Sequence, residues 1–362
     1  MLTKAHGSRC NAEQPVYVPY NQKIHAKKDE FLLKFIAALC VLAITAGYSV
    51  AQVEDDLTAK RRLLAGVGPG LRAIKRGADG KTYVLASPSL GLVVYDGTGN
   101  QVLTIGAQTA GSARAKPGRL PITFGEDCDI DADGKIYVAD RGANLVQVFS
   151  SEGALLRSIP VNAPVGVAAM PEGEVAVATL REPHLLIVFD KNGKDVREFG
   201  DPEPIADRAE LNRYLNIGLL ATDTQGHIYY GFRYLPEPTV RQYDRYGYAG
   251  SDVQYTAVEA YPAAQAARKE IARQEKRGDS PSFKSILTAV GVDRANGEVW
   301  FALHNTLLHF DKEGNRLASY KLYTPEGARL EANTILVTKD NLIIGSDPLG
   351  VYEFNRPDKK LN

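Results

Sequence analysis

Hydrophobic and polar residues alternate with a period of two in short runs along most of the chain after about residue 60. The clearest stretch is Cys128–Ile159, where such runs are separated by the polar turns Asp133-Gly134 and Ser151-Glu152-Gly153. β-Branched and aromatic residues in period-two runs between Gly and Asp turns are typical of half-buried antiparallel strands. The stretch therefore predicts a four-stranded antiparallel meander. A sheet this small cannot bury both faces alone, so we expect it to pack against copies of itself.

The same strand-turn-strand unit occurs six times. The copies begin near residues 79, 128, 172, 224, 296 and 339, and each has a polar turn between two apolar runs. Units of one kind at a period of roughly 40 to 50 residues are the signature of a propeller. We therefore predict an all-β fold, a six-bladed β-propeller of four-stranded antiparallel blades.

The sixth unit lacks an outer strand. It stops after Phe354-Asn355, whereas the segment that leads into Gly66 resembles the end of the other units. We predict that residues 60–66 supply the missing strand and so close the ring from the N-terminal side.

The N-terminal part is a different kind of sequence. Residues 1–30 are polar and irregular, then an uncharged apolar run follows Lys34 and ends near Ser49-Val50-Ala51, a small-x-small cleavage pattern. This predicts a secretory signal peptide. Residues 35–53 are also close to the ~17–25 residues that span a bilayer, so a retained membrane anchor stays open. Either way, the preceding positive charges place the propeller outside the cytoplasm, periplasmic or secreted.

The predicted organisation has three parts. Residues 1–52 are the polar N-terminus with its signal or anchor, residues 57–357 are the propeller, and residues 358–362 are a tail. A helical insertion is expected at about 256–285, because Pro262–Arg277 consists of strong helix formers and Gly278 follows it. Its apolar side is mostly alanine, which favours a solvated cap over one rim; a partner-binding helix is the alternative. The connection 201–216 is polar enough to be surface.

Composition excludes some function classes. The chain has 43 basic and 43 acidic residues, so no global field points to nucleic acid. Cys10 and Cys40 precede the proposed cleavage point, which leaves Cys128 without an intrachain disulfide partner. We expect Cys128 to be a buried structural thiol and the chain to be a monomer.

The segment Asp131–Gly153 resembles a known family. Its pattern D-x-D-G-x-I-Y-V-A-D, followed by N-x-V-Q-V-F and a closing Gly turn, resembles the NHL repeat of six-bladed bacterial propellers. The resemblance extends over about residues 60–357. It implies the ring fold, but propellers of this kind include ligand sensors, protein- or RNA-binding modules and some enzymes.

Loops between second and third strands carry an arginine in three consecutive units: Arg141, Arg181 and Arg233. Arginines on one rim of the channel could bind a carboxylate, a phosphate or an acidic glycan through bidentate hydrogen bonds. The alternative is that they are separate, solvated or paired with acidic neighbours such as Asp140 and Glu182. We favour a binding module without a cofactor, for a protein partner or a small anionic ligand.

An enzyme is the alternative from another class. Glu126, Asn216 and Asn333 precede innermost strands and could provide oxygen ligands for Ca²⁺. Gluconolactonase-like propellers use a metal set of this general character, so the resemblance also allows a calcium-dependent hydrolase or lyase. The histidines at 184, 227, 304 and 309 show no paired spacing, which favours structural roles. The tyrosines at 83, 137 and 229 fall in strands, and we expect them to pack between blades.

Overall fold

A computed structural model describes residues 55–64, 66–86, 91–107, 121–180, 183–247, 253–257 and 261–357. The chain divides into two units, Met1–Gln52 and Val53–Asn362, and the described residues belong to the second. The predicted signal or anchor, including residues 35–53, and the tail 358–362 lie outside the described residues. Among the described helices, none is long and apolar enough to cross a membrane.

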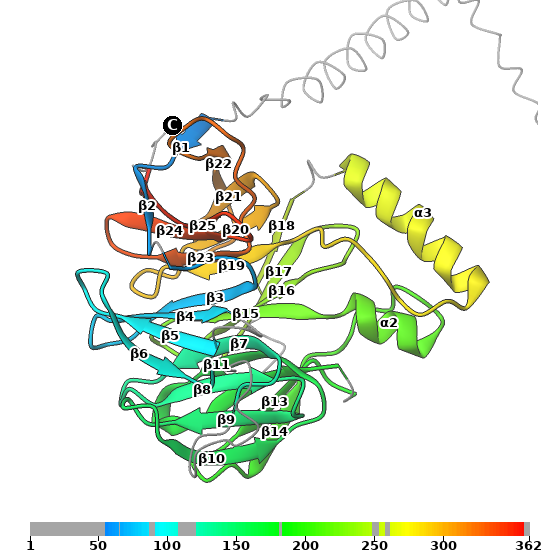
Figure 1. The fold of residues 1–362 in the computed structure, drawn as a ribbon. Coiled ribbons are helices and arrows are strands. Elements are labelled where there is room, and N and C mark those ends of the chain that lie inside the picture. Colours follow the sequence, from blue (N-terminus) through cyan, green and yellow to red (C-terminus); the bar gives the residue numbers. More distant parts are fainter. Residues whose placement is uncertain are drawn as a thin grey trace, which may run out of the picture. The chain divides into compact units, whose positions relative to one another are not determined.

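Six sheets form the ring, and in each blade strands adjacent in the chain pair antiparallel (Figure 1). This confirms the predicted fold, and Cys128–Ile159 lies in blade 2. The strands of blades 1 to 3 are β3 (Leu71–Arg76), β4 (Thr82–Ala86), β5 (Gly91–Tyr95), β6 (Gln101–Ile105), β7 (Gly125–Ile130), β8 (Ile136–Asp140), β9 (Leu145–Phe149), β10 (Leu155–Pro160), β11 (Pro164–Ala169), β12 (Val175–Thr179), β13 (Leu186–Phe189) and β14 (Asp195–Phe199). Those of blades 4 to 6 are β15 (Gly218–Thr222), β16 (Ile228–Phe232), β17 (Thr239–Tyr243), β18 (Val253–Thr256), β19 (Ala289–Val292), β20 (Val299–Leu303), β21 (Thr306–Phe310), β22 (Arg316–Tyr323), β23 (Thr334–Val337), β24 (Asn341–Ser346) and β25 (Gly350–Asn355).

In blades 1 and 2, an Asp-Gly turn joins the first two strands. In blade 2, Asp131 Oδ1 accepts a hydrogen bond from the Lys135 amide at 2.8 Å, and the Gly134 amide donates to the Asp131 carbonyl at 3.1 Å. Gly134 has φ 79°, a left-handed conformation that glycine adopts without steric cost. The turn that the sequence predicts at Asp133-Gly134 is therefore present.

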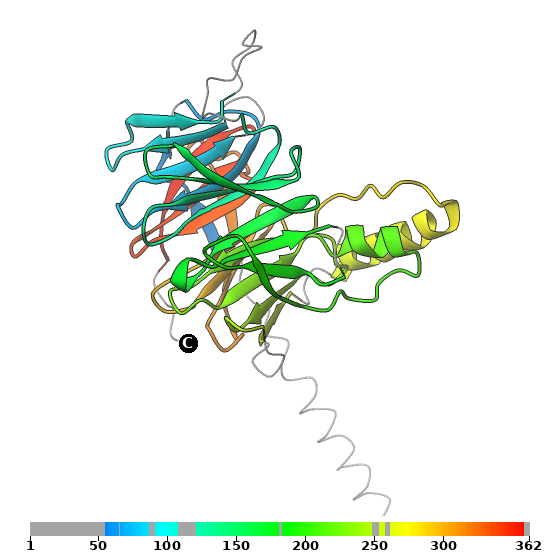
Figure 2. The same ribbon diagram turned by 90° about the horizontal axis from the view of Figure 1, so that it is seen from below.

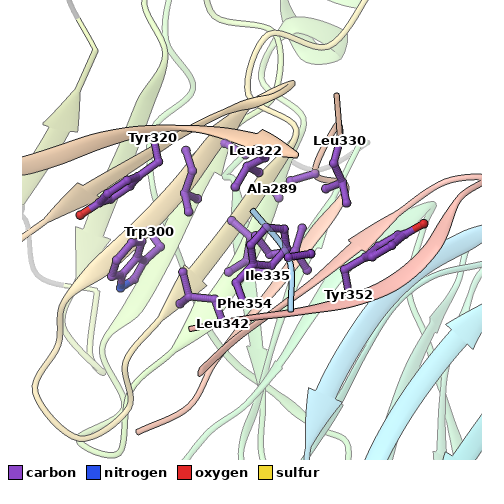
Figure 3. Close-up of a cluster of buried hydrophobic side chains, with 14 residues drawn as sticks. Ala289, Trp300, Tyr320, Leu322, Leu330, Ile335, Leu342, Tyr352 and Phe354 are labelled. Atoms are coloured by element: carbon purple, nitrogen blue, oxygen red, sulfur yellow. The ribbon is translucent and has the colours of Figure 1, made fainter. Parts of the chain in front are cut away.

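The N-terminal strand closes the ring, as predicted. Strand β2 (Arg61–Leu63) pairs antiparallel with β25 as the outer strand of blade 6, with Arg61 opposite Glu353. Strand β1 (Asp55–Thr58) was not expected: it pairs in parallel with β22, as a fifth strand of blade 5. Between them, Ala59 is buried in the layer that joins blades 5 and 6. Trp300 and Phe354 belong to the same layer (Figure 3). The N-terminal segment thus binds both blades together.

The core consists of layers between neighbouring blades. Tyr83, from blade 1, is buried with Cys128 and Ile136 of blade 2, and Tyr137 of blade 2 is buried with Val167 of blade 3. Tyr229 packs in the same way against blade 5. These positions confirm that the tyrosines pack between blades. Cys128 is fully buried, and burial raises the pKa of its thiol well above the ordinary value, as expected for an inert structural cysteine.

Two α-helices lie together beside the ring. Helix α3 (Tyr261–Arg277) follows the predicted limits, and α2 (Ala209–Leu215) falls in the connection expected to be a polar surface loop. The two helices lie side by side (Figures 1 and 2). Leu211 and Leu215 of α2 are buried with Ile271 of α3. The spacing of four residues puts both leucines on one face of α2, so the pair of helices has its own small apolar core. A 3-10 turn, η1 (Pro171–Gly173), follows β11.

Candidate functional site

The large cavity lies at one mouth of the central channel. Its volume is about 1450 Å³, and it is lined by the last residues of all six inner strands, β3, β7, β11, β15, β19 and β23, and by the hairpins that follow them. This mouth is opposite the one at which the sequence led us to expect function, which is formed by the loops that precede the inner strands. The cavity is large for a small-molecule site, which typically measures ~300–1000 Å³.

Basic side chains occupy one arc of this mouth. Arg76 belongs to blade 1, Arg294 to blade 5 and Lys339 to blade 6. All three side chains are exposed and line the cavity. Inner strands β19, β23 and β3 are consecutive neighbours in the ring, so the three cations share one side. In the described part of the chain, none of the three forms an ion pair. We call these three residues the cationic arc.

Lys75 lies deeper than the cationic arc. Its Nζ is 3.9 Å from a carboxylate oxygen of Asp127 in blade 2 and 3.5 Å from the backbone oxygen of Leu220 in blade 4. Blades 1 and 4 are opposite one another in a six-bladed ring, so this side chain crosses the channel. Burial lowers the pKa of Lys75, but the carboxylates of Asp127 and Asp129 raise it, and the net pKa is above the ordinary value. Lys75 is therefore a positive charge at the floor of the cavity.

Two carboxylates join blade 2 to blade 3 at this depth. Asp127 Oδ2 accepts a hydrogen bond from the Val167 amide at 3.2 Å, and Asp129 Oδ2 accepts one from the Ala169 amide at 2.9 Å. Burial raises the pKa of Asp127 to about 6, against the opposing effect of Lys75. Both carboxylates therefore have structural partners.

Asp131 and Asp223, which also line the cavity, hold the inner hairpins. Asp131 Oδ2 accepts a hydrogen bond from the Tyr137 hydroxyl at 3.0 Å, and Asp223 Oδ2 has the Tyr229 hydroxyl at 3.3 Å and His227 Nδ1 at 2.7 Å. Both carboxylates also accept backbone hydrogen bonds within their own turns. Their negative charge is thus buried in the blades.

A buried charged network forms the wall on blade 5. Arg356 forms ion pairs with Asp293 at 2.5 Å and with Glu298 at 2.6 Å, and Glu298 is 3.1 Å from His309 Nε2. The His309 ring stacks on Trp300 with centroids 3.6 Å apart. A buried charge is strongly destabilising unless it is paired with an opposite charge, as Arg356 is here. The expected structural role of His309 agrees with this environment.

Of the predicted arginines, Arg141 and Arg233 lie at the other mouth. Arg141 Nε is 2.6 Å from Glu126 Oε1, and its guanidinium lies 4.8 Å from the ring centre of Phe124. Arg233 does not contact Arg141 in the described part; its backbone oxygen accepts hydrogen bonds from Ile286 and Leu287. Arg181 lies outside the described residues. The structure thus brings together one predicted arginine and one predicted calcium ligand, as an ion pair.

The side chains of the other two calcium candidates, Asn216 and Asn333, form hydrogen bonds with backbone groups. Asn216 Oδ1 accepts a hydrogen bond from the Glu203 amide at 2.8 Å, and its Nδ2 donates to two carbonyls. Asn333 Oδ1 accepts from the Asp347 amide at 2.7 Å. With Glu126 paired to Arg141, the three side chains do not fit a calcium site as they stand. Within the described residues, no group of three His, Cys, Asp or Glu side chains is placed to hold a metal.

The sequence did contain a signal for the cationic arc. Aligned at the turn between the first two strands, units one, five and six have Arg76, Arg294 and Lys339, whereas units two to four have no basic residue among the cavity-lining positions. The three basic residues lie at the end of the blades opposite to the loops that carry Arg141 and Arg233.

No protein-family model matches the chain, and no curated protein does either. Among solved structures, the chain is similar to a streptogramin B lyase, with 12% identity over 80% of this chain and 84% of that chain and a TM-score of 0.52. A virginiamycin B lyase from Staphylococcus aureus aligns at 12% identity over 82% and 88% of the two chains, with a TM-score of 0.49. At such identity the likeness to the streptogramin B lyase shows the fold alone. The chain is a six-bladed β-propeller, and its membership of the NHL group stays a prediction.

Proposed function

We propose that the protein is an extracytoplasmic binding module that captures a small anionic ligand at the channel mouth formed by the inner-strand hairpins. The observation that carries the proposal is the cationic arc, Arg76, Arg294 and Lys339, which lines a cavity of about 1450 Å³ and forms no ion pair in the described part. The arginines offer planar, bidentate donors that match carboxylate or phosphate oxygens. The ligand class is therefore a carboxylate- or phosphate-bearing molecule.

The distribution of charge in the cavity, rather than its sum, supports an anion at the cationic arc. The carboxylates of Asp129, Asp131 and Asp223 accept hydrogen bonds from the protein, and those of Asp293 and Glu298 are bound by Arg356. Asp340 is an exposed acidic side chain in the same lining. The cationic arc and Lys75 carry four positive charges, compared with the one negative charge of Asp340. The concave surface therefore focuses positive potential on one side of the mouth.

Titration calorimetry with citrate and inorganic phosphate tests this function. We expect binding that weakens as salt rises, because exposed charges are screened. The double variant Arg76→Gln/Arg294→Gln should lose at least ~10-fold in affinity, since each charged hydrogen bond contributes roughly 1.5–3 kcal/mol. Arg268→Gln, which removes an exposed charge on α3, is the matched control. Equal binding by the wild type and the double variant would refute the site.

The alternative that the sequence suggests is a calcium-dependent hydrolase or lyase. It would require Glu126, Asn216 and Asn333 to exchange the partners that they have in this structure for calcium. If the protein binds calcium, a free calcium concentration of ~100 times the Kd should raise the free energy of unfolding by about 2.7 kcal/mol. Thermal unfolding that does not respond to millimolar calcium would count against this candidate.

A further inference from the structure

A second cavity lies under helix α3, away from the channel. Its volume is about 510 Å³, and it lies between the alanine face of α3, the segment 283–286 and the strands β20, β21 and β22 of blade 5. Such a volume is typical of small-molecule sites. The lining is mainly apolar: Ala263, Ala266, Ala267, Phe283, Ile286, Leu303 and Leu308.

The cavity continues the apolar layer between blades 4 and 5. Leu308 belongs to that layer, where it is buried with Tyr229 and Phe301. Strand register places Ser319 opposite Leu308 and Lys321 opposite Thr306, so these side chains share the face of blade 5 that α3 covers. A ligand here would extend the buried layer outward.

The floor holds a polar atom that has no partner. Ser319 is 3% exposed, and its Oγ makes no hydrogen bond within the described residues. A buried hydroxyl without a partner destabilises the fold, and a ligand oxygen that accepts a hydrogen bond from it would relieve this cost. Lys321 lies two residues further along the same strand, and its Nζ is 2.6 Å from Thr306 Oγ1.

The charges around the cavity are mostly positive. Lys284, Arg316 and Lys321 line it, whereas the acidic residue in the lining, Glu270, is paired with Arg273 on the same helix. Together with the apolar walls, this charge favours a molecule with a hydrocarbon body and one negative head group.

We propose that the cavity under α3 binds a small carboxylic acid with an apolar body. The body lies against the alanine face of α3, and the carboxylate is held by the Ser319 hydroxyl and the Lys321 ammonium. This site is independent of the channel mouth and of the ligand proposed there.

Binding of octanoate, octanol and octylamine, measured by calorimetry on the full chain, tests the proposal. Octanoate should bind saturably at up to millimolar concentration, octanol at least 10-fold more weakly, and octylamine more weakly still. Ala266→Phe fills the cavity and should abolish binding of octanoate. Gln265→Phe adds the same ring at the neighbouring position outside the lining, and should leave binding unchanged.

A second variant separates charge from shape. Lys321→Met keeps the apolar stem, so it should reduce octanoate affinity to that of octanol while octanol binds as before. Far-ultraviolet circular dichroism and the Tm establish that each variant is folded. No saturable binding of octanoate to the wild type, or equal binding by the wild type, Ala266→Phe and Lys321→Met, would overturn the proposal. Equal affinity for octanoate and octanol would overturn the assignment of the carboxylate.

Discussion

At Asp127, burial and a nearby charge act in opposite directions on one carboxyl group. Burial raises the pKa of Asp127 from 3.8 to about 6, and the charge of Lys75 at 3.9 Å only partly offsets this. In the folded chain the carboxyl therefore retains its proton to a higher pH than in the unfolded chain. It follows that this group stabilises the fold below about pH 4, and that the contribution is lost as pH rises through about 6.

Asp127→Asn removes this titration. We expect the stability of the variant, relative to the wild type, to increase by up to ~3 kcal/mol between pH 4 and pH 7. Urea unfolding of both proteins at a series of pH values measures the difference. A difference that is constant over this range, or that falls with pH, would contradict the raised pKa of Asp127.

The Tyr137 hydroxyl is the buried partner of Asp131. Tyr137→Phe leaves the ring in place but removes the 3.0 Å hydrogen bond, so it should cost about 1–3 kcal/mol in unfolding free energy. The half-buried Tyr323 is a matched control, because its hydroxyl forms no hydrogen bond with any residue that the structure describes. Tyr323→Phe should therefore change the free energy of unfolding by less than ~0.5 kcal/mol. Denaturant unfolding compares the two. Equal effects would show that the Tyr137 hydroxyl has no special role.

The environment of a residue can be predicted from the sequence where the repeat itself determines it. The Asp-Gly turns, the tyrosines between blades and the buried Cys128 follow from period-two patterning and turn chemistry. Arg141 and Glu126 were assigned to different hypothetical sites, yet they form one ion pair. A long side chain can reach several neighbours, and the choice among them depends on strand register and on loop geometry that a single sequence does not specify.

Among the elements, the two short N-terminal strands are the most consequential. Strand β2 completes blade 6, and β1 extends blade 5, with Ala59 buried between them. The closing strand was predictable because the sixth unit is one strand short. The parallel strand β1 was not, since blade 5 already has its four strands and nothing in the pattern indicates a fifth.

Deleting residues 57–66 should destabilise the whole ring rather than one blade. We expect a cooperative loss of more than about 5 °C in Tm, because the deletion exposes the edge of β25 and opens the layer around Ala59. A chain that starts at Val53 retains both strands and is the control. An unchanged Tm in the deletion variant would rule out closure by this segment.

The helices illustrate a different limit. Helix α3 was predicted from propensity, but its alanine-rich sequence suggested that no face is deeply buried. Instead Ile271 is 7% exposed, because Leu211 and Leu215 of α2 cover it. The missing information was the partner helix, which occupies only seven residues in a segment of polar composition.

For the molecule as a whole, the two mouths of the channel differ in charge arrangement. At the mouth formed by the loops that precede the inner strands, Arg141 is paired with Glu126. At the opposite mouth, Arg76, Arg294 and Lys339 line a large cavity. A repeat predicts that there are two mouths and which residues surround each. It does not predict how side chains fill the channel, because that depends on how far side chains such as Lys75 reach across it.

The position of a bound anion tests the central claim most directly. A crystal of the protein soaked in selenate, with anomalous scattering measured at the selenium edge, locates the anion without assumption about the natural ligand. Our account predicts a selenium peak within hydrogen-bonding distance of at least two members of the cationic arc, Arg76, Arg294 and Lys339. A peak at the opposite mouth beside Arg141 or Arg233, with none at the cationic arc, would contradict it.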